Sequence, residues 1–135
     1  MTETWPKAIE FVLRHEGGYS NDPNDPGGET NWGISKRSYP DRDIKNLTID
    51  QAKDIYYNDY WLKNDCEIRE WPLDLILFDT AVNMGSKRAK VLQQESFDWK
   101  DYLISRIAYY RRLNKDRYFK GWVNRVLDLY VLIKG

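Results

Sequence analysis

The spacing of apolar residues along the chain predicts a mostly helical protein. From residue 5 onward, apolar side chains recur at helical intervals, namely Trp5, Ala8, Ile9, Val12 and Leu13. The same series continues to Glu16, and the two glycines that follow end a helix over residues 5–16. A carboxyl group on the core-facing side of a helix end is uncommon, so Glu16 needs a specific reason to be there.

Further helices are predicted along the rest of the chain. Thr48 and Gln51 form a capping box at the start of a helix over residues 48–60. Residues 72–85 are apolar on nearly every side, which predicts a buried central helix. The remaining helices are expected over residues 86–94, 98–114 and 122–133, with Gly121 between the last two.

Residues 17–34 interrupt the helical pattern. They contain five glycines and two prolines, which indicate an irregular loop or a small hairpin. No internal repeat, linker or low-complexity segment divides the chain, and 135 residues fit one domain. The sequence therefore predicts a single domain over residues 1–135, mainly α, in which a helical bundle surrounds a buried central helix.

Composition narrows the classes of function. Lys plus Arg and Asp plus Glu both number 21, and this zero net charge argues against a nucleic-acid binder. Six Trp and ten Tyr suit a dense core or a cleft that stacks on carbohydrate. Cys66 is the only cysteine, so an intrachain disulfide is excluded. The N-terminus lacks the pattern of a secretory signal, and no apolar run predicts stable membrane insertion.

Several chemistries are excluded for residues 15–34. His15 is the only histidine, so the paired histidines of a zinc protease are absent. A calcium loop starting at Asp22 would have Pro26 and Gly33 at ligand positions, and neither supplies a side-chain ligand. The glycines follow no phosphate-binding spacing, and no Ser or Cys nucleophile is placed beside His15. We therefore expect no metal and no cofactor.

Carboxylate chemistry remains. Glycoside hydrolysis uses a general acid, commonly with a second carboxylate that activates water or stabilises positive charge. Glu16 suits the acid, because partial burial beside an apolar stripe favours the protonated carboxyl. Asp22, Asp25 and Glu29 are candidates for the second group. For Asp22, a turn-forming role before proline is the stronger interpretation.

The stretch "HEGGYSNDPNDPGGETNWGI" (15–34) closely resembles the signature of glycoside hydrolase family 108, the phage and prophage N-acetylmuramidases. The resemblance continues in "YNDYW" (57–61), "DLILFDTAVNMGSKRA" (74–89), "LQ" (92–93) and "GWVNRV" (121–126). It implies an α+β lysozyme-like fold and cleavage of the β-1,4 bond between N-acetylmuramic acid and N-acetylglucosamine. Members commonly carry a longer, wall-binding segment after the "LQ" helix, so this chain resembles a shortened catalytic domain.

The resemblance also implies roles for single residues. The catalytic glutamate of the family corresponds to Glu16. A looser muramidase pattern of Glu, eight residues and Asp selects Asp25, followed by a threonine after five residues. Thr30 follows after only four residues, so its substrate-binding role can pass to Asn31, for which a turn role is the alternative. Tyr19 is expected either to stack on a sugar ring or to pack the loop onto the helices.

A polar stripe crosses the otherwise apolar central helix. Asp79, Asn83 and Ser86 lie at positions i, i+4 and i+7, so they share one face. Such a stripe faces either a cleft or an internal hydrogen-bonded network. Because the resemblance includes Asp79 and Asn83, we favour the cleft and assign both to substrate binding. Asp79 is also a reserve candidate for the second carboxylate, and a possible partner for Arg88 or Arg125.

These inferences predict a monomeric phage or prophage endolysin that acts on peptidoglycan glycan strands and binds no nucleic acid. It would be made in the bacterial host cytoplasm and would reach the cell wall in the periplasm with the help of a holin-type partner. One alternative is a lytic transglycosylase, which cuts the same bond without water. A second alternative is a non-catalytic peptidoglycan-binding module.

Overall fold

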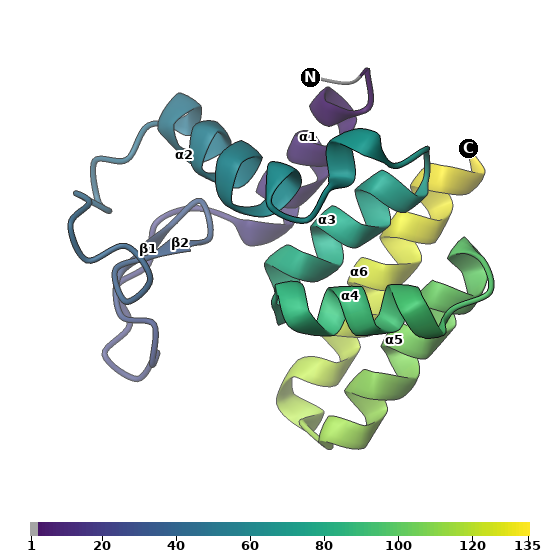
Figure 1. Ribbon diagram of the computed structural model, residues 1–135. Helices are drawn as coiled ribbons and strands as arrows, with labels where there is room; N and C mark the ends of the chain where they lie inside the picture. Colours follow the sequence, from purple (N-terminus) through teal and green to yellow (C-terminus); the bar gives the residue numbers. More distant parts are fainter. Residues whose placement is uncertain (1–2) are drawn as a thin grey trace. The chain divides into compact units, whose positions relative to one another are not determined.

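The computed structural model describes residues 3–135, and the chain forms two compact units, Met1–Lys63 and Asn64–Gly135 (Figure 1). Most of the described residues are helical, and their strands form one small antiparallel pair in the first unit. This architecture confirms the predicted mainly α fold with a small hairpin near the N-terminus. Within the described residues, no helix combines the length and the apolar character that a membrane span requires. The single domain over residues 1–135 stays a prediction.

The first unit begins with the helix α1 (Trp5–Glu16), whose bounds match the prediction. Its buried face consists of Trp5, Ala8, Ile9, Phe11 and Val12. Gly17 ends the helix because it adopts a φ of 75°, a conformation that favours glycine. The apolar stripe thus fixes the helix against the core of its own unit, and Glu16 stands at the point where the helix stops.

A hairpin follows the glycine-rich loop. Strand β1 (Thr30–Asn31) pairs antiparallel with β2 (Ile34–Ser35), so that Trp32 and Gly33 form a two-residue turn. Both turn residues have positive φ, 55° for Trp32 and 79° for Gly33. Two-residue hairpin turns of this kind need positive φ at both positions, which glycine adopts readily and tryptophan rarely.

The helix predicted from residue 48 is present and changes its winding near the end. The capping box of Thr48 and Gln51 starts α2 (Ile49–Tyr56), which continues directly into a π-helix, η1 (Tyr57–Leu62). Trp61 of η1 is fully buried, and its ring makes an edge contact with Trp5 of α1, with ring centroids 5.2 Å apart. The wider π winding is infrequent and often occurs at functional sites.

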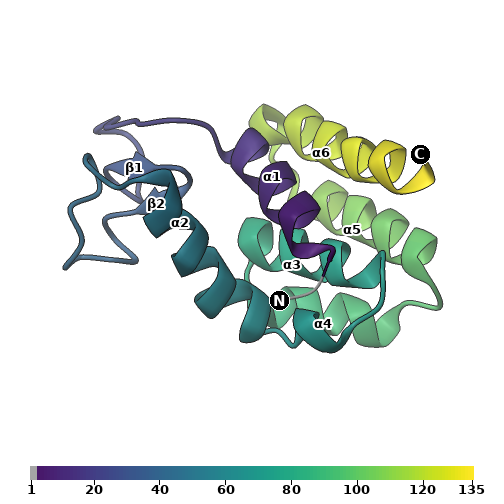
Figure 2. The same cartoon turned by 90° about the horizontal axis from the view of Figure 1, so that it is seen from above.

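The second unit is helical throughout. After the short 3-10 helix η2 (Cys66–Ile68) come α3 (Leu73–Met84), α4 (Ser86–Glu95), α5 (Trp99–Leu113) and α6 (Asp116–Lys134). Residues 74–81 of α3 are all buried, which confirms the predicted central helix. Helices α5 and α6 run side by side (Figure 2).

The predicted break at Gly121 is wrong. Gly121 lies inside α6, and the chain turns earlier, at Asn114, which ends α5 with a φ of 54°. Asparagine is the non-glycine residue that most readily takes this left-handed conformation after a helix. The helix tolerates Gly121 because its cost, about 1 kcal/mol relative to alanine, is small beside the packing of the whole helix.

Candidate active site

Glu16 is held at the end of α1 by the hairpin turn of its own unit. A Cβ atom added to Gly33 would lie 2.7 Å from Cβ and 2.8 Å from Cγ of Glu16. The backbone of the turn therefore rests directly on the stem of the Glu16 side chain, and only glycine leaves room for this approach. The side chain is half-buried, so the carboxyl is neither sealed in the core nor fully solvated.

The turn is anchored from the helix α2. The hydroxyl of Tyr56 donates a hydrogen bond of 2.7 Å to the backbone carbonyl of Trp32. The same hydroxyl lies 2.5 Å from the position that a Cβ atom of Gly33 would occupy. Tyr56 and Glu16 thus meet the turn at the same point. No role was predicted for Tyr56 from the sequence, although this residue immediately precedes the "YNDYW" block.

The other side of the turn is tied to the chain before α2. The indole nitrogen of Trp32 donates to the carbonyl of Leu47 at 3.1 Å. The amide nitrogen of Asn31 donates to the carbonyls of Ile44 and Lys45 at 3.1 and 3.2 Å. Asn31 is 7% exposed, so its side chain holds the loop in place. This contact favours the turn role over substrate binding, the two alternatives that the sequence left open for Asn31.

Two further tyrosines and an aspartate belong to the surroundings of Glu16. The hydroxyl of Tyr39 donates a hydrogen bond of 2.6 Å to Asp59, in η1. The pKa of Tyr60 is raised, first by burial and then by the negative charges of Asp59 and Glu16, while a hydrogen bond with Tyr39 acts in the opposite direction. Tyr60 is therefore within electrostatic reach of Glu16. The sequence signal for Asp59 and Tyr60 was the "YNDYW" block, to which no chemistry was assigned, whereas Tyr39 had no sequence signal.

The loop between α1 and the hairpin carries the other predicted residues of the first unit. Asp25 is exposed, and one of its carboxylate oxygens accepts a hydrogen bond of 2.9 Å from the backbone of Gly27. Asp22 accepts the equivalent bond from Asn24, as the turn interpretation expects. The second oxygen of an Asx-turn carboxylate stays available, and the role of Asp25 as the second carboxylate stays a prediction.

Tyr19 and Thr30 lie at the two sides of this loop. The hydroxyl of Tyr19 donates to the carboxylate of Glu29 at 2.6 Å, and the residue remains 43% exposed. Thr30 belongs to β1, and its backbone pairs with Ser20. An exposed ring whose hydroxyl is fixed can present its face to a ligand, so the sugar-stacking role of Tyr19 stays open as a prediction. The substrate-binding role of Thr30 stays a prediction as well.

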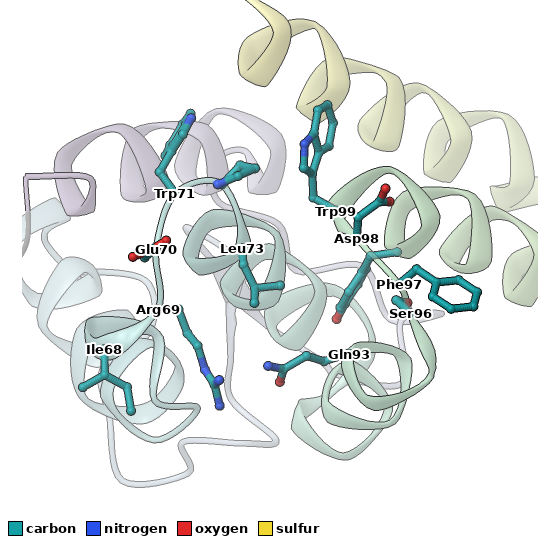
Figure 3. A pocket seen from close by; sticks show the side chains of 12 residues that line it. Ile68, Arg69, Glu70, Trp71, Leu73, Gln93, Ser96, Phe97, Asp98 and Trp99 are labelled. Atoms are coloured by element: carbon teal, nitrogen blue, oxygen red, sulfur yellow. The ribbon is translucent and has the colours of Figure 1, made fainter.

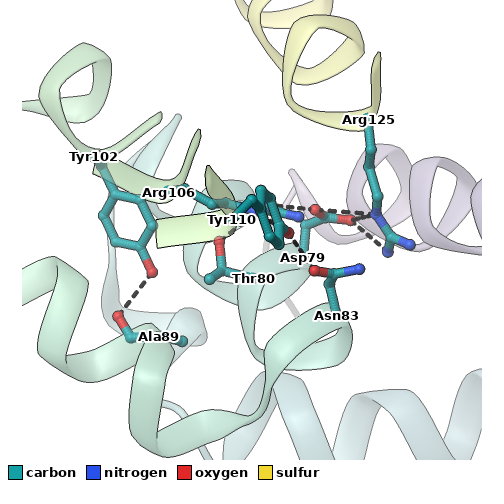
Figure 4. A network of polar contacts seen from close by, with 8 residues as sticks. All are labelled: Asp79, Thr80, Asn83, Ala89, Tyr102, Arg106, Tyr110 and Arg125. Atoms are coloured by element: carbon teal, nitrogen blue, oxygen red, sulfur yellow. Dashed lines mark hydrogen bonds and ion pairs between the residues drawn. The ribbon is translucent and has the colours of Figure 1, made fainter. Parts of the chain in front are cut away.

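Asp79, in the second unit, lies in a different environment. Its carboxylate is 0% exposed and receives a hydrogen bond of 2.8 Å from Arg106 and another of 2.8 Å from Arg125 (Figure 4). Arg125 is one of the two partners considered from the sequence. The other, Arg88, instead lies over the ring of Tyr109, 4.4 Å from its centroid. Arg106, which lies 27 residues from Asp79 in the sequence, was not among the predicted partners.

Asn83 belongs to the same buried network. Its side-chain oxygen accepts a hydrogen bond from the hydroxyl of Tyr110, which itself accepts one of 2.9 Å from Arg106 (Figure 4). The ring of Tyr110 stacks on Trp122, with centroids 4.7 Å apart. The polar face of α3 is therefore engaged in an internal network. This favours the second of the two alternatives over the substrate-binding cleft that we expected for Asp79 and Asn83.

The charge of Asp79 is fixed by its partners. Burial by itself would raise the pKa of this carboxyl, but the guanidinium groups of Arg125 and Arg106 outweigh burial and hold the pKa below its usual value. A carboxylate in this state is a poor proton donor or acceptor near neutral pH. The contacts thus favour a structural role for Asp79.

A pocket of about 590 Å³ lies elsewhere in the second unit, between the segment before α3 and the junction of α4 with α5. Figure 3 shows Arg69 and Gln93 entering it from opposite walls, with Trp71 and Trp99 at its rim. None of the predicted site residues lines this pocket. Among residues 3–135, no group of three or more His, Cys, Asp and Glu side chains is arranged to hold a metal ion.

Comparisons with known proteins show a similar solved structure and a matching family model. A solved structure described as that of Brucella abortus SagA is similar over 93% of this chain and 91% of its own, with 28% identity and a TM-score of 0.80. No curated protein matches the sequence. The family model of glycosyl hydrolase 108 matches residues 9–85, more than half of the chain, and this segment includes both Glu16 and the hairpin turn. The chain therefore belongs to glycosyl hydrolase family 108, and it is a glycoside hydrolase by family.

Proposed function

We propose that this protein is a peptidoglycan hydrolase that cleaves the β-1,4 bond between N-acetylmuramic acid and N-acetylglucosamine, with Glu16 as the general acid. The observation that carries the proposal is the position of Glu16, half-buried at the end of α1 with its stem fixed by the Gly33 turn. A general acid needs a defined orientation toward the bond that it protonates. Membership of family 108 supports glycoside chemistry at this carboxyl.

In the proposed reaction, Glu16 donates its proton to the glycosidic oxygen as the bond to the leaving sugar breaks. Asp25 activates the attacking water or stabilises the positive charge that develops on the sugar ring. The distance between the two carboxyl groups in the substrate complex selects the stereochemistry, since roughly 5–5.5 Å suits retention and about 6.5–9.5 Å suits inversion. Tyr19 would present its exposed ring to a sugar, and Thr30 would contact the same strand.

The biological setting that we propose is lysis of a bacterial host by a phage or prophage. The enzyme would be made in the host cytoplasm, be released with the help of a holin-type partner, and work on the cell wall from the periplasm as a monomer. Its target would be the glycan strand, which suits a chain that is rich in aromatic side chains.

Clearing of purified peptidoglycan by the wild type and by Glu16→Gln tests the proposal. Glu10→Gln, which changes an exposed glutamate on the same helix, is the matched control. We expect Glu16→Gln to lose a factor of about 100 or more in rate, since a positioned general acid contributes about 10²–10⁴-fold. We expect Glu10→Gln to match the wild type. If wild type and Glu16→Gln clear the wall equally poorly while both still bind it, the protein is a binding module and the proposal is wrong.

A lytic transglycosylase is the second candidate. Such an enzyme needs a general acid but no carboxylate to activate water, because it leaves an anhydro-muramic end. The hydrogen bond of Asp25 to its own turn, at the backbone of Gly27, is the observation that favours it. The products distinguish the two reactions, since only hydrolysis leaves a muramic acid end that can be reduced.

A further inference from the structure

Glu16 is the last residue of α1, so no further turn of this helix follows it. Gly17 leaves the helix at once with a φ of 75°. A glutamate side chain has several torsions, and fixing them costs conformational entropy. A general acid at this position therefore needs an external support that restricts its stem.

The hairpin turn supplies that support, yet its own conformation needs to be enforced. Trp32 and Gly33 both have positive φ, and tryptophan rarely adopts this conformation. A backbone with this strained conformation persists only where several surrounding contacts hold it in place. The bonds of Asn31 and Trp32 to residues 44–47 fix the base of the hairpin. The hydrogen bond from the Tyr56 hydroxyl to the Trp32 carbonyl fixes the peptide between Trp32 and Gly33.

The geometry around Gly33 connects this hydrogen bond to Glu16. The Tyr56 hydroxyl and the Glu16 stem lie 2.5 Å and 2.7 Å from a single point, the position of a Cβ atom on Gly33. The hydroxyl and the carboxylate side chain are thus neighbours on one side of the turn. A shift of the Trp32–Gly33 peptide changes the surface on which the Glu16 stem rests.

We propose that Tyr56 is a positioning residue for Glu16: its hydroxyl fixes the Trp32 carbonyl, this keeps Gly33 against the stem of Glu16, and the carboxyl is thereby confined to the orientation in which it protonates the glycosidic oxygen. The inference rests on the proposed function, because it takes Glu16 as the acid. Tyr56 itself acts through the turn and makes no contact with substrate in this scheme.

The location of Tyr56 suits a rigid support. It is 1% exposed and is the last residue of α2 before the π-helix begins. The ring of Tyr60, one turn further on, packs beside it with centroids 5.6 Å apart. The change to π winding directly after Tyr56 brings Tyr60 and Asp59 into the same neighbourhood, where Asp59 accepts the hydrogen bond from Tyr39. The ring of Tyr56 is therefore held in place by its own surroundings, in addition to the hydrogen bond that its hydroxyl makes to the turn.

The experiment uses Tyr56→Phe in the full chain, with rates measured on soluble, uncross-linked peptidoglycan strands. We expect kcat to fall by roughly 10–100-fold, because misplacing a reacting group by about 1 Å costs about 10²-fold. KM should stay within about threefold of the wild type, because the acid is misplaced while substrate binding is preserved. Tyr118→Phe, which removes a hydroxyl from a half-exposed ring in α6, is the control and should match the wild type.

A double variant distinguishes positioning from a general loss of structure. If Tyr56 acts only through Glu16, adding Tyr56→Phe to Glu16→Gln should slow the reaction by less than about twofold beyond Glu16→Gln alone. An equal loss in both backgrounds would overturn the proposal. A Tyr56→Phe enzyme with unchanged kcat would also overturn the proposal, whether or not its KM is raised.

A second variant disturbs the same contacts from the turn, and thermal unfolding shows whether each variant is folded. Gly33→Ala brings a methyl group to 2.5 Å from the Tyr56 hydroxyl and 2.7 Å from the Glu16 stem, so at least one of them must shift, and kcat should fall with KM preserved. Unchanged kcat in Gly33→Ala would contradict the proposal. The two claims can fail separately: if the wild type does not cleave the strands, or if Glu16→Gln retains full activity, the proposed function fails. If the wild type is active and Glu16→Gln is not, but the Tyr56 and Gly33 variants match the wild type, then only the positioning role is rejected.

Discussion

Glu16 and Asp79 are both acidic residues on helices that also carry apolar faces, yet the structure places them in opposite environments. Glu16 is half-buried at a helix end, with its stem against a glycine turn. Asp79 is in the middle of α3, fully buried, and bound by two arginines. A group that exchanges protons needs access and a defined orientation, whereas a paired, sealed carboxylate stays ionised and serves the fold. These environments support our proposal of a chemical role for Glu16 and favour a structural role for Asp79.

The largest expected effect is the loss of activity in Glu16→Gln. Glu16→Gln should lower the rate of wall clearing by about 10²–10⁴-fold, because the amide cannot donate a proton to the glycosidic oxygen. Its melting temperature should stay within about 2 °C of the wild type, since the amide has nearly the same shape and the site is half-buried. Activity assays with parallel thermal unfolding check both parts. A variant that loses stability as well as activity would assign Glu16 to the fold.

Asp79→Asn should show the reverse pattern. Removing the charge leaves Arg106 and Arg125 buried without their carboxylate, which costs roughly 3–5 kcal/mol of unfolding free energy. The melting temperature should fall by roughly 10 °C or more. Chemical denaturation measures the change, with Asp41→Asn at an exposed position as control. A variant as stable as the wild type but inactive would contradict the structural role and restore Asp79 as a catalytic candidate.

The ion pairs of Asp79 with Arg106 and Arg125 predict that the stability of the protein depends on pH. Burial would raise the pKa of Asp79, but the charges and hydrogen bonds of Arg125 and Arg106 outweigh it and hold the pKa below its usual value. A depressed carboxyl pKa stabilises the folded state above the unfolded pKa, and this contribution is lost as the pH falls through the folded pKa. The difference in unfolding free energy between wild type and Asp79→Asn should therefore be constant from pH 7 to about pH 5 and shrink below about pH 4. A difference that already shrinks between pH 7 and pH 5 would rule out this assignment.

Asp25→Asn is expected to have the smallest effect of these variants. It tests whether Glu16 works with a second carboxylate. Asparagine can still accept the hydrogen bond from Gly27, so the turn is preserved and only the charge is removed. We expect hydrolysis to slow by about tenfold or more, with little change in melting temperature. Asp22→Asn, at the neighbouring turn, is the control. Equal rates for Asp25→Asn and wild type would remove Asp25 from the mechanism.

Local signals in the sequence predicted much of the fold. The bounds of α1 followed from apolar spacing and from Gly17, and the start of α2 followed from the capping box of Thr48 and Gln51. Both signals lie within a few residues of the structure that they determine. The end of α5 was predicted correctly, but the last helix was predicted to start only after Gly121, whereas α6 begins at Asp116 and runs through this glycine.

The environment of each carboxyl depends on residues far along the chain, and the sequence pattern does not specify them. A polar stripe on α3 is compatible with a cleft or a network, and the answer depends on Arg106 and Arg125, which are 27 and 46 residues from Asp79. The contact of Gly33 with Glu16 likewise requires the hairpin to fold back on α1. Residue types therefore identified Glu16 as a candidate acid, whereas tertiary packing was needed to identify its support by Gly33 and Tyr56.

The most direct test of the central claim is the mass of the products that the wild type releases from purified peptidoglycan. If Glu16 is the general acid of a muramidase that uses water, the fragments should carry N-acetylmuramic acid at a reducing end and should gain the mass of two hydrogens on borohydride reduction. Glu16→Gln should release almost none of them. Anhydro-muramic ends throughout would show that the reaction proceeds without water. Reducing ends of N-acetylglucosamine would show that a different bond is cleaved, and either result would contradict the account.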